Sequence, residues 1–172
     1  MTIANKLGAS YEAIRSAARI KTIQVELNDV HFELKVRVPV KREMDEITAK
    51  LATPDSALVE KLYEEMSKPL RETVSNVEDG FLEALNADGE KMRFTDNDVI
   101  VSGTSVRNVA TFTALWHKQV EMFFGLLQTP TGEPVTESYE EIANEFPEQV
   151  IREIIKKIDE AIRPSYKDAK KN

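Results

Sequence analysis

Between residues 21 and 40, apolar and polar side chains alternate, and this alternation predicts a β-hairpin. A period of two places one row of side chains on one face of each strand. The alternation changes parity at Asn28-Asp29, two residue types that suit a tight turn. The apolar positions of the two strands are Ile23, Val25, Leu27, Val30, Phe32, Leu34, Val36, Val38 and Val40.

The position of the turn also predicts the register of the hairpin. A two-residue loop gives the pairs Leu27–Val30, Val25–Phe32 and Ile23–Leu34 on the apolar face and Glu26–His31 and Gln24–Glu33 on the polar face. A shift by one residue would scramble both faces, so the register is well specified. A two-stranded ribbon is marginal in water. We therefore expect a helix to cover the apolar face, or a third strand from Val99-Ile100-Val101 or Met92-Arg93-Phe94.

Helical spacing of apolar residues dominates the segments on either side of the hairpin. A short helix is predicted over 10–19, and acidic helices are predicted over 41–85. The second acidic helix is expected to begin at Thr53-Pro54, with the threonine as N-cap and the proline in the first helical position. Pro69 is expected to kink this helix or to end it near Lys68.

A central helix is predicted over about 105–127, and its apolar residues form two rows. The first row recurs at spacings of four and three and consists of Val109, Thr113, Trp116, Val120, Phe123 and Leu127. The second row consists of Phe112, Leu115, Met122 and Leu126. Because two apolar rows need cover on more than one side, we expect this helix to be buried.

Two further helices and a tail complete the chain. Ser138 fits the start of a capping box that opens a short helix ending at Glu145, and Pro147 begins a helix rich in isoleucine. The predicted fold is therefore α+β and mostly helical, with the hairpin of about 21–40 packed on a helical bundle. We expect a single domain over 1–163, made of the hairpin at 21–40, the acidic helices at 41–85 and the central and C-terminal helices at 105–163. A flexible basic tail over 164–172 is expected to follow.

Composition narrows the classes of function. The 172 residues include no cysteine and carry a net charge of −7. The lack of cysteine excludes disulfides, thiol catalysis and cysteine-ligated metal sites. The acidic balance argues against nucleic-acid binding, and no run approaches the about 20 apolar residues of a membrane helix. Acids outnumber bases by 13 to 4 over residues 43–90, which indicates a solvated helical face or a surface that steers a basic partner.

The residues best suited to chemistry do not assemble into a catalytic pattern. His31 is expected to pair with Glu26 across the hairpin. His117 and Glu121 are one helical turn apart and offer two metal ligands, which leaves a metal-dependent enzyme as an alternative, although the sequence shows no third ligand nearby. The Asp96-Asn97-Asp98 run lacks the later glycine and glutamate of a calcium loop and is interpreted as a turn or helix cap. We predict no enzyme, no catalytic residue, no metal and no cofactor.

Two short motifs suggest a family. Leu115-Trp116-His117 within the apolar helix, and Glu145-Phe146-Pro147-Glu148 before an Ile/Val-rich helix, resemble the tail assembly chaperones of long-tailed, lambda-type bacteriophages. The resemblance covers mainly residues 105–163. It implies a non-enzymatic protein that binds the tape measure protein, keeps its apolar helices soluble and recruits tail tube subunits. It also implies action in the cytoplasm of the infected host and absence from the mature virion.

A chaperone of this kind needs an exposed apolar groove for amphipathic helices, and an acidic rim would favour basic clients. The candidate partner-binding residues are Trp116, Phe123, Phe124, Ile151 and Ile155. The default role of the aromatic residues among them is a place in the core, and lining a groove or an oligomer seam is the alternative. We also expect a homo-oligomer. Another non-enzymatic phage adaptor, structural or regulatory, is the alternative function.

Overall fold

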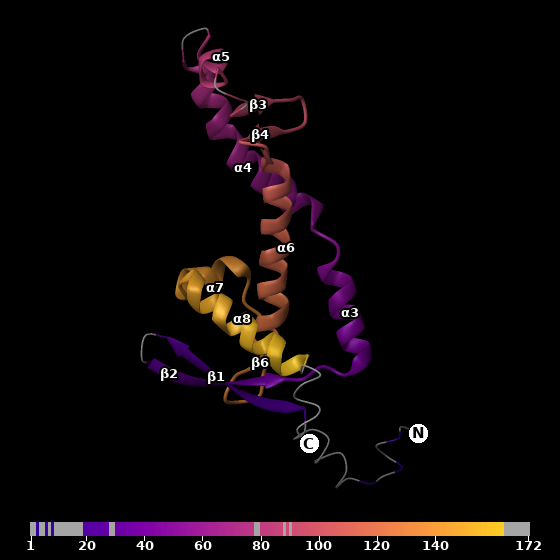
Figure 1. Ribbon diagram of the computed structural model, residues 1–172. Helices are drawn as coiled ribbons and strands as arrows, with labels where there is room; N and C mark the ends of the chain where they lie inside the picture. The colour runs from indigo at the N-terminus through magenta and orange to yellow at the C-terminus, as the bar shows by residue number, and fades with distance from the viewer. Residues whose placement is uncertain are drawn as a thin grey trace. The chain divides into compact units, whose positions relative to one another are not determined.

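A computed structural model gives the fold of the chain and describes residues 3, 6, 8, 19–27, 30–77, 80–87, 89 and 91–163. The fold is α+β, with an N-terminal hairpin packed against helices and a small second sheet (Figure 1). The chain divides into two compact units. The first unit combines Met1–Thr48 with Gln119–Asn172, and the second is Ala49–Lys118. The sequence pattern predicted a single domain over 1–163 and did not indicate this division.

Three sequence predictions fall outside the described residues. They are the helix over 10–19, of which only residue 19 is described, the turn at Asn28-Asp29, and the basic tail over 164–172.

The first unit is built around a three-stranded antiparallel sheet. β1 (Ile20–Leu27) pairs with β2 (Val30–Arg37), and Leu27–Val30, Val25–Phe32 and Ile23–Leu34 face one another as predicted. The third strand is β6 (Leu127–Gln128), in the order β1-β2-β6. The prediction that residues 92–94 or 99–101 supply this strand was wrong. β6 follows a turn at Gly125. Beside it, the Arg37 amide of β2 donates a 2.8 Å hydrogen bond to the carbonyl oxygen of Leu126.

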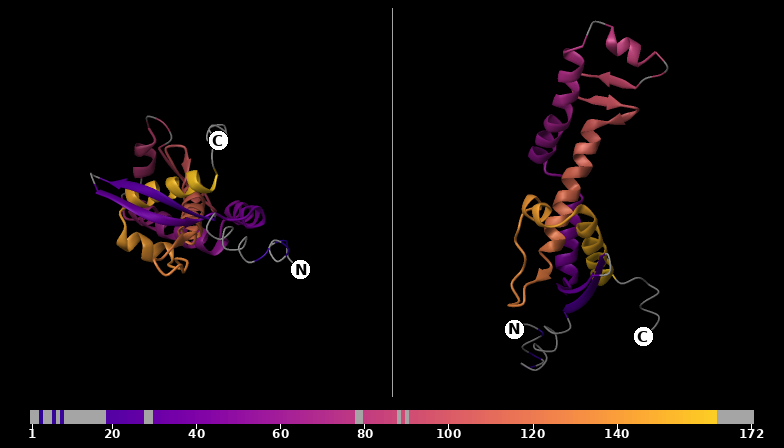
Figure 2. Two further views of the ribbon diagram at one scale, coloured as in Figure 1. Left: turned by 90° about the horizontal axis from the view of Figure 1, so that it is seen from below. Right: turned by 90° about the vertical axis from the view of Figure 1, so that its left-hand side faces the viewer.

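Helices complete the first unit. α3 (Lys41–Leu51) begins here, and α7 (Tyr139–Glu145) precedes α8 (Glu148–Ile162), which packs against β1 (Figure 2). Ser138 forms the predicted capping box with Glu141 at the start of α7. Buried residues of α8 recur at helical spacing and are Val150, Ile151, Ile154, Ile155, Ile158 and Ile162.

The core of the second unit lies between α4 (Ser56–Ser75), β4 (Val99–Val101) and α6 (Val106–Phe124). Its buried members are Val59, Leu62, Tyr63, Val99, Val106, Ala110 and Ala114. A surface contact joins α4 and α6 beside this core, where the Arg107 guanidinium lies 4.0 Å from the ring centre of Tyr63 and also pairs with Glu60.

One prediction about α4 was wrong, and one of the two alternatives given for Pro69 is excluded. The N-cap is Asp55, not Thr53, because the Asp55 carboxylate accepts from the amides of Ala57 and Leu58 at 2.9 and 3.3 Å. The helix also does not end near Lys68, because it continues through Pro69 to Ser75. Core residues lie before the proline, and Leu70 packs against the core just after it, so packing holds the helix across the lost backbone hydrogen bond.

The second sheet joins β3 (Met92–Phe94), β4 and β5 (Thr104–Ser105), and the short α5 (Phe81–Leu85) precedes it. Figure 2 shows β3 and β4 beside α4. Asp98 connects this sheet to α6 by accepting from the amides of Val99 and Arg107 at 2.8 and 3.0 Å and from the Ser105 hydroxyl. The interpretation of Asp96-Asn97-Asp98 as a turn and helix cap is confirmed.

α6 is shorter and less enclosed than predicted. It ends at Phe124, and Leu127, the last residue of the predicted seam, lies in β6. Along its second-unit part, Val109 is 40% exposed and Phe112 is 70% exposed. Among the described residues, no helix is both long and apolar enough to cross a membrane.

Candidate functional site

The first unit contains an apolar pocket of about 330 Å³ beside the hairpin, which we name the hairpin pocket. Its apolar lining comes from five segments: β2, the end of α6, the segment 127–135, the end of α7 and α8. These lining residues are Phe32, Leu34, Phe124, Leu127, Pro130, Val135, Ile142, Phe146 and Ile154. Pockets of this size with mainly apolar walls are typical of sites that receive a ligand or a partner side chain.

Local sequence explains why two of the walls face the pocket. Phe32 and Leu34 share the apolar face of β2, and both are only partly buried. Phe146 precedes Pro147, which disfavours helical backbone, and it adopts an extended conformation with φ −116° and ψ 131°. Its ring therefore leaves the line of α7 and meets Phe124 edge to face, with the ring centres 6.2 Å apart.

Three glutamates give the hairpin pocket an acidic rim. Glu137, Glu141 and Glu145 line the pocket and are exposed. They are spaced four residues apart, so Glu141 and Glu145 lie on one face of α7. No described lysine, arginine or histidine forms an ion pair with any of the three.

The middle glutamate of the rim is held ionised by the helix start. Glu141 Oε2 accepts from the Ser138 amide and the Ser138 hydroxyl, both at 2.8 Å. These two hydrogen bonds lower the pKa of Glu141 below its usual value. Glu141 therefore stays ionised at neutral pH beside an apolar hollow.

The five predicted partner-binding residues fall in different environments. Phe124 lines the hairpin pocket, although its side chain is almost wholly buried. Phe123, Ile151 and Ile155 are buried in the first unit and line none of the pocket surface. Trp116 is half-buried on the second-unit part of α6. The structure brings none of the other four to the pocket beside Phe124.

The candidate set missed the residues that lie open to the pocket, chiefly Phe32, Leu34 and Phe146. A sequence signal existed for Phe146, because the following proline removes it from the helix. Phe32 and Leu34 carried no such signal, since alternation places them on the apolar face of the hairpin without showing how much of that face is covered.

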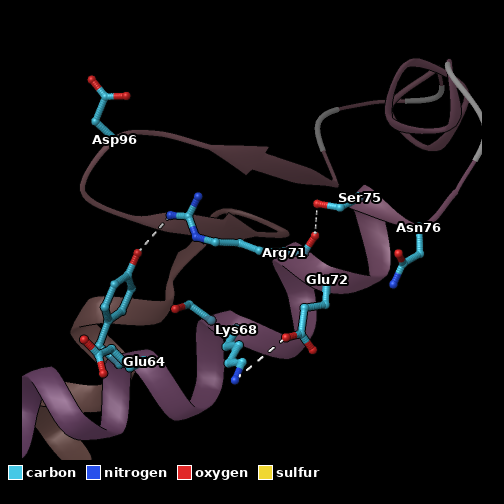
Figure 3. A pocket seen from close by; sticks show the side chains of 9 residues that line it. Glu64, Lys68, Arg71, Glu72, Ser75, Asn76 and Asp96 are labelled. Atoms are coloured by element: carbon cyan, nitrogen blue, oxygen red, sulfur yellow. Dashed lines mark hydrogen bonds and ion pairs between the residues drawn. The ribbon is translucent and has the colours of Figure 1, made fainter.

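A second hollow, of about 530 Å³, lies in the second unit between α4 and the turn at Asp96 (Figure 3). The two cationic side chains that line it, Arg71 and Lys68, both have partners within the second unit. Arg71 donates to the Tyr63 hydroxyl at 3.2 Å and to Thr95 O at 3.3 Å, and its guanidinium lies 5.5 Å from the centre of the Phe94 ring. Lys68 pairs with Glu72 at 3.9 Å. Arg71 therefore holds α4 against the second sheet, whereas the Lys68–Glu72 pair lies within α4.

Metal ligands do not gather in the part of the chain that the structure describes, where no group of three or more histidines and carboxylates could hold an ion. His31 Nδ1 lies 3.4 Å from Glu26 Oε1, and the two residues face one another across the hairpin as predicted. Glu121, the expected companion of His117, accepts from the Tyr139 amide at 2.9 Å and so connects α6 to the start of α7.

Comparisons of this chain with protein-family models, with curated protein sequences and with solved structures found no match.

Proposed function

We propose that this protein is a tail assembly chaperone of a long-tailed bacteriophage. In this proposal it binds helices of the tape measure protein, keeps them soluble and recruits tail tube subunits in the cytoplasm of the infected host. The observation that carries the proposal is the hairpin pocket, an apolar hollow with an acidic rim that no described cation neutralises.

The pocket provides what a helix-binding chaperone requires. An amphipathic helix is recognised when apolar side chains on one face enter a groove. Burial then contributes about 25 cal/mol for each Å² of apolar surface removed from water. A pocket that admits one or two side chains gives weak and reversible binding, which suits a protein that must release its client.

The family resemblance supports the same part of the molecule. Glu145 and Phe146, the first two residues of the second resembling motif, form part of the rim and the wall of the hairpin pocket. The first motif lies on α6, where Trp116 is half-buried. The two motifs therefore belong to different units, and the second one lies at the proposed site.

Co-expression tests the proposal. The full chain is produced together with the tape measure protein of the same genome, and the soluble fraction of the tape measure protein is measured. We expect that fraction to rise with the wild-type chain and to fall back with Phe32→Ala, which removes a pocket wall. Phe81→Ala is the matched control, because this phenylalanine is 38% exposed, belongs to the second unit and is not among the lining residues of the pocket.

Equal solubility with and without the chain would overturn the proposal. Thermal unfolding of both variants shows whether Phe32→Ala acts through folding. If Phe32→Ala lowers the soluble fraction of the tape measure protein while its unfolding midpoint matches that of Phe81→Ala, the loss results from the altered pocket.

A further inference from the structure

We infer that the hairpin pocket selects a basic amphipathic helix, with one large apolar side chain seated between Phe32 and Phe146 and with lysine or arginine opposite Glu137, Glu141 and Glu145. This inference rests on the proposed function and adds the chemistry of the partner. Charge complementarity carries it.

The rim glutamates differ from the acidic residues that cations of this chain already neutralise. Glu43 accepts from Arg19 at 2.7 Å and from Arg37 at 2.8 Å, and Glu60 pairs with Arg107. On α8, Glu148 pairs with Arg152 and Glu153 pairs with Lys157. The three rim carboxylates have no such partner among the described residues, so no described cation takes up their charge.

The spacing of the rim fits a helix as the partner. Glu141 and Glu145 are four residues apart on α7, and four residues of helix span about 6 Å, whereas Glu137 precedes the helix. A client helix lying along α7 presents cations at the same interval when lysines or arginines occur at every fourth position.

A second copy of this chain is a poor occupant. It carries a net charge of −7, the same sign as the rim, which disfavours its binding at this acidic site. The cations of its described C-terminal helix α8 are also taken up locally. Arg152 pairs with Glu148 at 2.8 Å, and Lys156 and Lys157 pair with Glu153 at 3.7 and 3.9 Å. A basic helix from another protein meets neither obstacle.

Synthetic peptides of about 20 residues, long enough to form a helix, test the inference with the intact chain. The first peptide has a leucine stripe flanked by lysines at every fourth position, and the second has glutamate in place of each lysine. Binding is measured by calorimetry at low and high salt. We expect the lysine peptide to bind at least tenfold more tightly at low salt and to lose most of this advantage at about 1 M salt, where charges are screened beyond about 3 Å.

A charge-neutralising variant assigns the effect to the rim. In Glu137→Gln/Glu145→Gln we expect the affinity for the lysine peptide to fall about three- to tenfold, as the loss of two exposed ion pairs predicts. Glu141 is left unchanged because it caps α7. The matched control is Glu133→Gln/Glu160→Gln, which changes net charge equally at two exposed residues of the first unit that do not line the pocket.

Several results would overturn the inference: no binding by the lysine peptide, equal binding of both peptides, or equal losses in rim and control variants. Sedimentation that shows a dimer dissociated by Phe32→Ala would also overturn it, because a second copy would then fill the pocket. The proposed function is tested separately. Rescue of the tape measure protein without any preference for lysine would refute only the charge selection, whereas tight lysine-peptide binding without rescue would refute only the chaperone function.

Discussion

Two phenylalanines on α6 test whether burial in this structure governs stability. Phe123 is 1% exposed and Phe112 is 70% exposed, and both are replaced by alanine in the same helix. Replacement of a fully buried phenylalanine loses its transfer free energy and leaves a cavity, at a cost of about 3–5 kcal/mol. At Phe112 most of the ring is already in water and alanine is the better helix former, so we expect a change within about 0.5 kcal/mol.

Guanidinium chloride unfolding, followed by far-UV circular dichroism, measures the two effects. For a chain of this size the free energy of unfolding falls by about 4 kcal/mol per M of denaturant. Phe123→Ala should therefore move the transition of the first unit down by about 1 M, whereas Phe112→Ala should leave every transition within about 0.1 M of wild type. Equal shifts in the two variants would refute the assignment of Phe123 to the core and of Phe112 to the surface.

Three further predictions concern local structure. Asp98→Ala should lower the stability of the second unit by about 1–2 kcal/mol. Burial raises the pKa of Asp98, but its hydrogen bonds from Ser105, Arg107 and Val99 lower that pKa overall. In denaturant titrations, the extra free energy of unfolding of the wild type should therefore be complete at neutral pH. It should be lost as the pH falls through the lowered pKa of Asp98. Ser138→Ala should lower the free energy of unfolding by about 1 kcal/mol at pH 7. Hydrogen bonds from Ser138 lower the pKa of Glu141, and the stabilisation they provide disappears when Glu141 is protonated. Unfolding measured at a series of pH values should therefore show a smaller difference between variant and wild type in acid. Gly103→Ala should cost about 1 kcal/mol in thermal unfolding, because Gly103 has φ +78° and open space around it, so only backbone strain opposes the methyl group.

The hairpin and its register could be predicted because a period of two leaves one consistent pairing across Asn28-Asp29. The partner of the hairpin could not. Residues 99–101 have the composition of a strand, but they pair with residues 92–94 and with Thr104–Ser105. The turn between β4 and β5 is Ser102-Gly103, both with positive φ. This Ser-Gly pair was the available sequence signal for a local hairpin.

The site was predicted less well than the fold, for a physical reason. Periodicity shows that Phe123, Ile151 and Ile155 are apolar and share helix faces, but it does not show which faces are covered. In the folded first unit these three are buried, and the open apolar surface is left instead at Phe32 and Phe146. Exposure depends on how segments distant in sequence pack together, and no single segment contains that information.

Substitutions in the rim of the hairpin pocket should affect partner binding without lowering the stability of the first unit. Three carboxylates in a row repel one another and, among the described residues, no cation offsets this repulsion. If their role were structural, Glu137→Gln/Glu145→Gln would destabilise the first unit. If they are kept for a basic partner, the same change removes repulsion, and it should leave the unfolding midpoint unchanged or slightly raised while binding weakens. A carboxylate whose removal costs affinity but not stability is best explained by the partner it meets.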